Sequence, residues 1–507
     1  MSHDFTDAMD LASLRLGGAV IATSDDYFAE MENLLKPGDA VFLPHEYTAR
    51  GKWMDGWESR RKRVVGHDWA IIRLGVPGVL RGAVVDTAFF RGNFPSHCSL
   101  DACALPTDAG VDALLADDVE WVEVLPRSPL QGDSKNLFAI DCEFAFTHVR
   151  LNIFPDGGVA RLRLFGDAVP DWRRIGHARG EIDVAAAEHG GHVLTCSDMF
   201  FGERRNLIMP DRALNMSDGW ETRRRRGPGH DWAIVRLGAR ATISRLLIDT
   251  NHFKGNYPDT CTVEACDAPG ASVESLTHGD HPWRPLLGRT KLHAHTRHLF
   301  EDELHALGPV THVRLNVFPD GGVSRLRVFG SLDASAKAAL GVRRLNTLLP
   351  RAAEAALLQC CGATRWARAM LHARPFASAD AVAAAADAHW AACGEDDWLE
   401  AFRAHPRIGE RKAHTDTGAE ASRWSAQEQA GMDRSDASLK AALAEVNAAY
   451  EAKYGFIYIV CATGMSPEAL LDYARRRMDS TREAELRTAA AEQHKILRLR
   501  LEKLLKP

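Results

Sequence analysis

The sequence predicts a multidomain protein in which two tandem all-β domains, each a jelly roll or sandwich, are followed by an all-α domain. Three observations support this prediction. A long module occurs twice, short alternating apolar segments fill both copies, and the composition becomes rich in alanine and leucine after Gly330. With 507 residues, the chain is long enough for three domains that each bury a core.

The first two-thirds of the chain consists of one module used twice. The segment DGWESRRKRVVGHDWAIIRLG at 55–75 returns as DGWETRRRRGPGHDWAIVRLG at 218–238, and LNIFPDGG at 151–158 returns as LNVFPDGG at 315–322. A repeat of about 165 residues is too long for a solenoid unit and has the size of a whole domain. We therefore expect two copies of one domain, packed with pseudo-two-fold symmetry.

Each copy of the module has the pattern of an antiparallel β domain. In the first copy, Val149, Leu151 and Ile153 alternate with Arg150 and Asn152, so one face of the strand is apolar and the other polar. The turn FPDGG joins this strand to a second alternating segment, RLRLFG, which is typical of a hairpin. Many short strands separated by turns favour a sandwich or jelly roll with little helix.

The C-terminal third has helical patterning instead. In SLKAALAEVNAAYEAKYG the apolar residues return with the period of a helix, and Gly455 is suited to its C-cap. The segment SPEALLDYARRRM begins with Ser466 and Pro467, which is typical of a helix start. The expected division is 1–170 for repeat 1, 171–332 for repeat 2, 333–345 for a linker and 346–507 for the all-α domain.

Composition and charge argue against several classes of protein. A net charge of −6 gives no electrostatic basis for nucleic-acid binding. No apolar run reaches the roughly 18 residues that a membrane span needs. Ten cysteines without a C-x-x-C pair support neither a disulfide framework nor a zinc cassette. Reduced thiols in a cytoplasmic protein are therefore expected.

Polar side chains recur at matching places in both repeats and form a candidate hydrolytic site. Arginine suits a carboxylate, asparagine suits urea-like groups, and a His–Asp step or a glutamate can act as general base on water. On this chemistry, the candidate catalytic residues are Glu221, His230, Asp231 and His252. The candidate substrate-binding residues are Arg223, Asn256, Asp218, Arg60 and Asn93. The recurrence also has a structural interpretation, in which these residues form ion pairs of a common fold.

The sequence leaves open whether the site holds a metal and which repeat is active. Each repeat has a His–Asp step that resembles a metal-ligand pair, but adjacent strand residues point to opposite faces and rarely share an ion. The repeats also differ. Repeat 1 has about ten extra residues around FLPHEYTARGKW. Phe89 corresponds to His252, and Arg91 corresponds to Lys254. Either one repeat holds the working site, or one site is shared at their interface.

The duplicated segments resemble the allantoicase family. The resemblance is carried by DGWExRRxR, GHDWAIxRLG, DTxxFxGNxP and LNxFPDGGxxRLRxFG, and it covers about residues 13–332. It implies a double jelly roll and the hydrolysis of allantoate to ureidoglycolate and urea. Allantoate is a carboxylate flanked by two ureido groups, so the polar set is chemically suited to it.

The all-α domain contains an unusual polar segment ahead of residue 425. His405 precedes Pro406, which disfavours a helical backbone at His405. Ser425 and Glu428 have the spacing of a capping box, so a structural role is open to both.

The wider pattern of this domain resembles the 2-oxo-4-hydroxy-4-carboxy-5-ureidoimidazoline (OHCU) decarboxylase family over about residues 345–505. The segments AHPRIGE, SAQEQAG and EVNAAYEAKYGFIYIVCATG carry the resemblance. It implies cofactor-free loss of CO2 to give (S)-allantoin. The implied catalytic residues are His405 and Glu428, and the implied substrate-binding residues are Ser425 and Gln429. An arginine near the last helix grips a carboxylate in that family, and we assign it to Arg477, with Arg476 and Arg482 as alternatives.

The expected function is a bifunctional enzyme of purine ureide breakdown. It would act on small ureide substrates as a homo-oligomer, with no nucleic-acid or membrane partner. Two alternatives remain at this point. One is a double jelly roll that binds ligands without catalysis, and the other is a protein with only one active domain.

Overall fold

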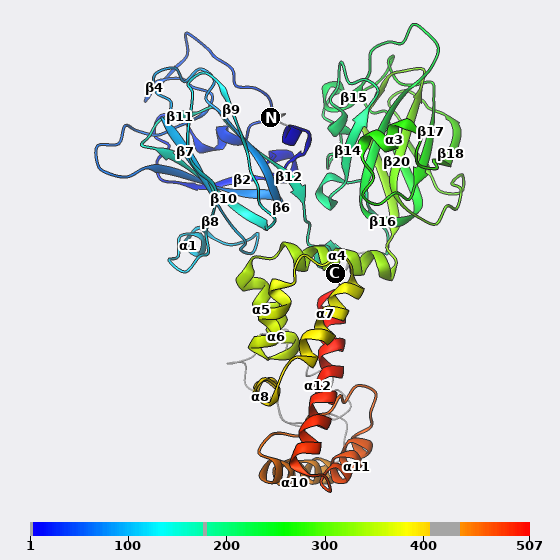
Figure 1. Ribbon diagram of the computed structural model, residues 1–507. Coiled ribbons are helices and arrows are strands. Elements are labelled where there is room, and N and C mark those ends of the chain that lie inside the picture. Colours follow the sequence, from blue (N-terminus) through cyan, green and yellow to red (C-terminus); the bar gives the residue numbers. More distant parts are fainter. Residues whose placement is uncertain (1–3, 176–179, 406–436, 507) are drawn as a thin grey trace. The chain divides into compact units, whose positions relative to one another are not determined.

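The structure is a computed structural model that describes residues 4–175, 180–405 and 437–506 (Figure 1). The chain divides into two compact units, Met1–Ala336 and Lys337–Pro507. The first unit contains both β repeats and the second is helical. Among the described residues, no helix combines the length and apolar character needed to cross a membrane.

Repeat 1 is built around one very long strand, β6 (Asp68–Asp86), whose two halves pair with different partners. Its first half pairs with β2 (Ala19–Thr23) and β10 (Ala145–Phe154), and its second half pairs with β9 (Lys135–Ala139) and β12 (Arg161–Ala168). All these pairings are antiparallel. The hairpin expected at FPDGG is therefore wrong: β10 and β12 flank β6 in the strand order, because each pairs with a different half of that long strand. The order β1-β12-β6-β10-β7-β8 is completed by β1 (Met9–Asp10), β7 (His97–Cys103) and β8 (Val122–Pro129).

Repeat 2 has the same topology, in the order β13-β22-β16-β20-β17-β18, with β14 and β19 also on the central strand. The strands are β13 (Ile182–Asp183), β14 (His192–Cys196), β16 (Asp231–Asp249), β17 (Thr260–Cys266), β18 (Arg284–Lys291), β19 (Arg297–Phe300), β20 (Pro309–Phe318) and β22 (Arg325–Ser331). Helix is limited to short pieces such as α1 (Val111–Leu114) and α3 (Val273–His278). The predicted tandem sandwiches are confirmed.

The alternating pattern of the sequence corresponds to the core. Val149, Leu151 and Ile153 on β10 are fully buried, and Leu315 and Val317 of β20 are buried in the same way in repeat 2. Burying such side chains contributes about 1.5–3 kcal/mol each, which is why the period-two pattern specifies the inner face of each strand.

The two repeats differ most in one surface segment. Repeat 1 inserts a hairpin of β3 (Tyr47–Thr48) and β4 (Gly51–Lys52), whereas repeat 2 has the short turn η6 (Met216–Asp218) at the matching place. Beside this segment lies a small two-stranded sheet in each repeat. It pairs β5 (Trp57–Glu58) with β11 (Gly158–Val159) in repeat 1, and β15 (Trp220–Glu221) with β21 (Gly322–Val323) in repeat 2.

The helical unit has a core formed by Trp366, Tyr450 and Leu497, among others. Its helices are α4 (Ala334–Thr347), α5 (Pro350–Cys361), α6 (Thr364–His372), α7 (Ala379–Ala391), α8 (Glu395–Arg403), α10 (Ala437–Tyr454), α11 (Pro467–Arg477) and α12 (Arg482–Leu504). Ser466 caps α11 by accepting a hydrogen bond from the Ala469 N–H, as predicted. Residues 333–345, expected as a linker, are largely helical within α4, because their alanine-rich composition favours helix.

Candidate functional site

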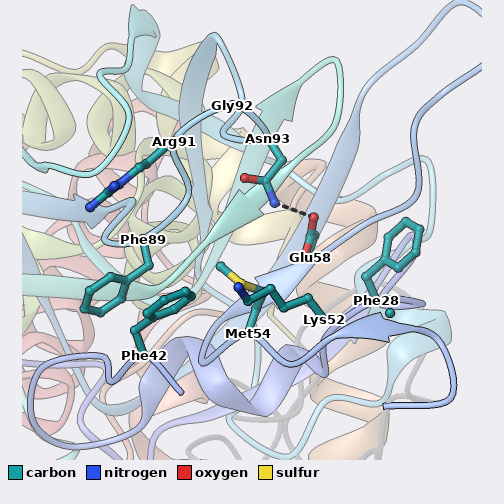
Figure 2. Close-up of a pocket in the computed structure, with 10 residues that line it drawn as sticks. Phe28, Phe42, Lys52, Met54, Glu58, Phe89, Arg91, Gly92 and Asn93 are labelled. Carbon is teal, nitrogen blue, oxygen red and sulfur yellow. Dashed lines mark hydrogen bonds between the residues drawn. The ribbon is translucent and has the colours of Figure 1, made fainter. Parts of the chain in front are cut away.

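A polar pocket of about 390 Å³ opens on repeat 1, next to the inserted hairpin (Figure 2). It is lined by Phe28, Phe42, Gly51, Lys52, Met54, Glu58, Phe89, Arg91, Gly92 and Asn93. The pocket therefore combines a carboxylate, two cationic side chains, an amide and three aromatic rings. This set suits a small polar substrate that carries both a charge and amide-like groups.

Glu58 and Asn93 form the polar centre of the pocket. The Asn93 amide donates a hydrogen bond of 2.7 Å to Oε1 of Glu58. Within the described residues, the other carboxylate oxygen of Glu58 accepts no hydrogen bond and is available to a water or a substrate. Burial raises the pKa of the Glu58 carboxyl above its ordinary value, and the Asn93 hydrogen bond opposes this rise only in part. Such a carboxyl is suited to general acid–base catalysis.

The backbone around this pair is held on several sides. Glu58 pairs with Gly158 on β11, and its N–H donates to the carbonyl of Ala29 at 3.1 Å. The N–H of Gly158 donates to the Asn93 carbonyl at 2.8 Å. A Cβ at Gly158 would lie 2.0 Å from the Phe90 ring, so only glycine allows this turn to pack under the Asn93 loop. The recurring FPDGG segment thus positions Asn93 beside Glu58.

Aromatic side chains form the opposite wall. Phe42 from the insertion stacks on Phe89 with ring centroids 5.4 Å apart and planes 20° from parallel. The Lys52 ammonium lies 4.6 Å from the centre of the Phe42 ring. Phe89 has a φ of 68°, which is unfavourable for a non-glycine residue, and Asp133 Oδ1 accepts its N–H at 2.8 Å. Asp133 also accepts a hydrogen bond from Nε of Arg91 at 3.0 Å.

Repeat 2 keeps the polar pair, but the contacts beside it differ. The Asn256 amide donates to Glu221, as Asn93 donates to Glu58. Nε2 of His252 lies 2.8 Å from the carbonyl of Ala213, and the Met216 sulfur lies 3.7 Å from the Asn256 amide. The shorter segment of repeat 2 thus places its own atoms against the groups that line the pocket in repeat 1.

The other residues predicted for the hydrolytic site have mainly structural contacts. Asp231 is buried and accepts hydrogen bonds from Ser197 and Arg225, and the ring of His230 packs on Phe318 at 4.6 Å. Within the described part of the chain, neither His230 nor Asp231 hydrogen-bonds to Glu221. The contacts that the structure shows for His230 and Asp231 are thus with neighbouring residues of the fold.

The predicted aspartate and arginines of this set are also paired. Asp218 accepts a hydrogen bond of 3.1 Å from the buried Arg325. Arg60 pairs with Asp25, and Arg223 makes the equivalent pair with Asp198. Of the predicted substrate-binding residues, Asn93 is the one that lines the pocket.

Sequence reasoning did not select Lys52, Phe42 or Met54. The length difference between the repeats could have pointed to them, because the ten extra residues of repeat 1 contain or border all three positions. Within residues 4–175, 180–405 and 437–506, no three His, Cys, Asp or Glu side chains are grouped as metal ligands.

In the helical unit, the structure describes only part of the predicted decarboxylase site. His405 is buried and follows the end of α8, outside a helix as predicted. Glu428, Ser425 and Gln429 lie outside the described residues.

Arg477 is enclosed in the core of the helical unit and is only 5% exposed. Its Nε donates to Glu485 at 2.7 Å, its Nη1 donates to the Ile459 carbonyl at 2.7 Å, and its Nη2 donates to the Tyr450 hydroxyl at 3.2 Å. These contacts favour a structural role, since all three nitrogens already have partners inside the protein.

Comparison with known proteins gives consistent matches for both units. The family model described as "Allantoicase repeat" matches residues 9–169 and 182–333, and the one described as "OHCU decarboxylase" matches residues 346–502. A probable allantoicase of Pseudomonas aeruginosa is 52% identical over 327 residues, which is 64% of this chain and 97% of that protein. The crystal structure of allantoicase from Saccharomyces cerevisiae is 36% identical with a TM-score of 0.54, covering 64% of this chain and 93% of that one.

Proposed function

The chain belongs to the allantoicase family and carries an OHCU decarboxylase domain, and on this premise we propose that repeat 1 holds the hydrolytic site. In this proposal the Glu58 pocket takes allantoate and water and releases ureidoglycolate and urea. The proposal rests on the Glu58–Asn93 pair, which lines an open pocket. Beside the equivalent Glu221–Asn256 pair of repeat 2, His252 contacts Ala213 and Met216 contacts Asn256.

Glu58 can supply both proton transfers of this reaction. Its carboxylate takes a proton from water as the water oxygen bonds to the central carbon of allantoate. The bond from that carbon to one ureido nitrogen breaks, and the protonated Glu58 returns the proton to that nitrogen, so the leaving group is neutral urea. A raised pKa favours this cycle, because the carboxyl becomes a stronger base and is readily protonated.

Asn93 has two tasks in this scheme. Its amide N–H orients the Glu58 carboxylate, and its carbonyl oxygen remains able to accept an N–H from a ureido group of the substrate.

For the helical unit, we propose decarboxylation of OHCU to (S)-allantoin without a cofactor, with His405 and Glu428 as the catalytic pair. Ser425 and Gln429 are the proposed substrate-binding residues. Loss of CO2 leaves an electron pair on carbon that must be protonated, and a histidine beside a carboxylate is suited to deliver that proton. The two reactions are not consecutive, because allantoin must be opened to allantoate between them, so direct transfer between the sites is not expected.

Urea release by variants of the full chain tests the hydrolytic assignment. Glu58→Gln keeps the size of the side chain and an oxygen that can accept the Asn93 hydrogen bond, but it loses the base, so it should lower kcat by roughly 100-fold or more. Glu221→Gln is the matched control in repeat 2 and should keep most of the activity. If Glu58→Gln retains full urea release, or if Glu221→Gln loses it instead, the assignment to repeat 1 is wrong.

A third variant separates the two domains. His405→Ala should abolish loss of OHCU, followed by its ultraviolet absorbance, and leave urea release from allantoate unchanged. Loss of both activities in this variant would contradict independent sites.

A further inference from the structure

We infer that Lys52 binds the substrate carboxylate and determines the preference of the pocket for an anionic ureide. This inference rests on the proposed function of the Glu58 pocket. Lys52 belongs to the inserted hairpin, which repeat 2 lacks, and it was not among the residues that the sequence pattern selected.

The position of the ammonium group is the first support. Lys52 lines the same pocket as Glu58 and Asn93. Figure 2 shows its side chain running across the pocket toward the Phe42 ring, and the ammonium lies 4.6 Å from the centre of that ring. A cation over an aromatic face is held in place without losing its capacity for hydrogen bonds.

The second support is the lack of a competing anion. Among the described residues, no carboxylate forms an ion pair with Lys52. By contrast, the nearby Lys36 pairs with Asp55, and Lys62 pairs with Asp68. All three N–H donors of the Lys52 ammonium therefore remain available to a bound anion.

The other cation of the pocket is placed differently. Arg91 donates through Nε to Asp133, and Figure 2 shows its guanidinium directed away from Glu58 and Asn93. Lys52 is consequently the cation better placed to meet a carboxylate that sits beside the Glu58–Asn93 pair.

The β3–β4 hairpin sets the backbone position of Lys52 at the pocket. Tyr47 pairs with Lys52 and Thr48 with Gly51, and the N–H of Trp53 donates to the Glu46 carbonyl at 3.1 Å. The hairpin is attached to the domain through Arg50, whose Nη1 donates to the Tyr27 carbonyl at 3.0 Å.

Within the described residues of repeat 2, no hairpin corresponds to β3–β4, and so no lysine is presented as Lys52 is. Asn215 lies there instead, and its side chain accepts the Ser217 N–H and caps the turn η6. Anion binding is thereby expected in repeat 1 alone.

The test compares a charged ligand with an uncharged one on the full chain. Lys52→Met removes the charge but keeps an unbranched side chain, and Lys52→Arg keeps the charge. The ligands are allantoate and its carboxamide, in which an uncharged amide replaces the carboxylate. KM is measured for allantoate, and the carboxamide is scored as a competitive inhibitor, so no turnover of the carboxamide is needed.

In Lys52→Met, the KM for allantoate should rise about 10- to 100-fold, because one charge-assisted contact is lost. The inhibition constant of the carboxamide should change less than about twofold, since it makes no such contact. Lys52→Arg should restore most of the affinity for allantoate. Lys291→Met, at an exposed lysine outside the pocket, is the matched control and should leave both constants unchanged.

Two outcomes would overturn the inference. One is an unchanged KM for allantoate in Lys52→Met, and the other is an equal loss for both ligands. Failure of the proposed function is distinguishable, because Glu58→Gln would then release urea at the wild-type rate whatever residue stands at position 52.

Discussion

Asn93 donates a 2.7 Å hydrogen bond to Glu58, and Asn256 makes the same contact with Glu221 in the second repeat. The duplicated chain thus contains the same acid–amide pair twice. The segment next to the pair differs between the repeats. In repeat 1 a pocket lies beside the pair, whereas in repeat 2 Ala213 contacts His252 and Met216 contacts Asn256.

We expect the hydrogen bond from Asn93 to influence the acid limit of activity. It lowers the pKa of Glu58, while burial raises it. Asn93→Ala removes the lowering contribution, so the pKa of Glu58 rises further and a higher pH is needed to ionise the base. The acid limb of kcat/KM for urea release should therefore move to higher pH. Asn256→Ala is the control, and an unmoved limb in Asn93→Ala would show that Glu58 is not the titrating base.

Asp133 should act as a positioning residue for the aromatic wall. It accepts the N–H of the strained Phe89 and holds Arg91. Asp133→Ala should lower kcat/KM by roughly tenfold, because Phe89 and Phe42 lose their fixed geometry. Asp133→Asn keeps the acceptor for Phe89 and should recover most of the activity. Equal losses in the two variants would instead indicate that the charge on Asp133 matters more than the backbone contact.

Gly158 should tolerate no side chain. Its Cβ would lie 2.0 Å from Phe90, so Gly158→Ala should cost about 1–3 kcal/mol of stability through overpacking. It should also reduce urea release, because the turn supports Asn93. Gly227→Ala, where an added Cβ meets nothing within 4 Å, is the matched control in chemical denaturation. An unchanged midpoint for Gly158→Ala would contradict the close packing of this turn.

Arg477 should stabilise the helical unit. It is 5% exposed and its partner Glu485 is fully buried, so Arg477→Gln leaves a buried carboxylate without its cation. Breaking such a pair costs about 3–5 kcal/mol. Arg476→Gln, at an exposed pair with Asp472, should change stability by no more than about 0.5 kcal/mol. Calorimetry of the full chain should show a lower Tm for the unfolding of this unit in Arg477→Gln alone. An unchanged Tm with a raised KM for OHCU would support a substrate-binding role.

The periodicity of the sequence was sufficient to predict the strands. Val149, Leu151 and Ile153 alternate because one face of β10 is buried, and burial of apolar area is the largest stabilising contribution that a sequence displays directly. The Ser466 cap was predictable for a similar reason, since it depends on neighbours in the chain. The hairpin expected at FPDGG is wrong, because β10 and β12 each pair with β6 and not with each other, and this pairing depends on a distant segment.

The site required contacts between segments that are distant in sequence. His230 and Asp231 have the chemistry of a catalytic step, yet Asp231 is buried against Ser197 and Arg225. Glu58 and Asn93 look no more reactive in the sequence than Glu221 and Asn256. Their burial, their shared hydrogen bond and the open pocket arise only when β5, the Asn93 loop and the inserted hairpin come together.

Periodicity and motifs are local properties of the chain, and they were enough to predict the duplicated sandwich, the helical unit and the family of each. The placement of Glu58, Asn93 and Lys52 around one pocket depends instead on tertiary contacts. An ionisable group acquires its pKa, its partners and its access to solvent from residues far along the chain, and Lys52 and Glu58 line one pocket only in the folded domain.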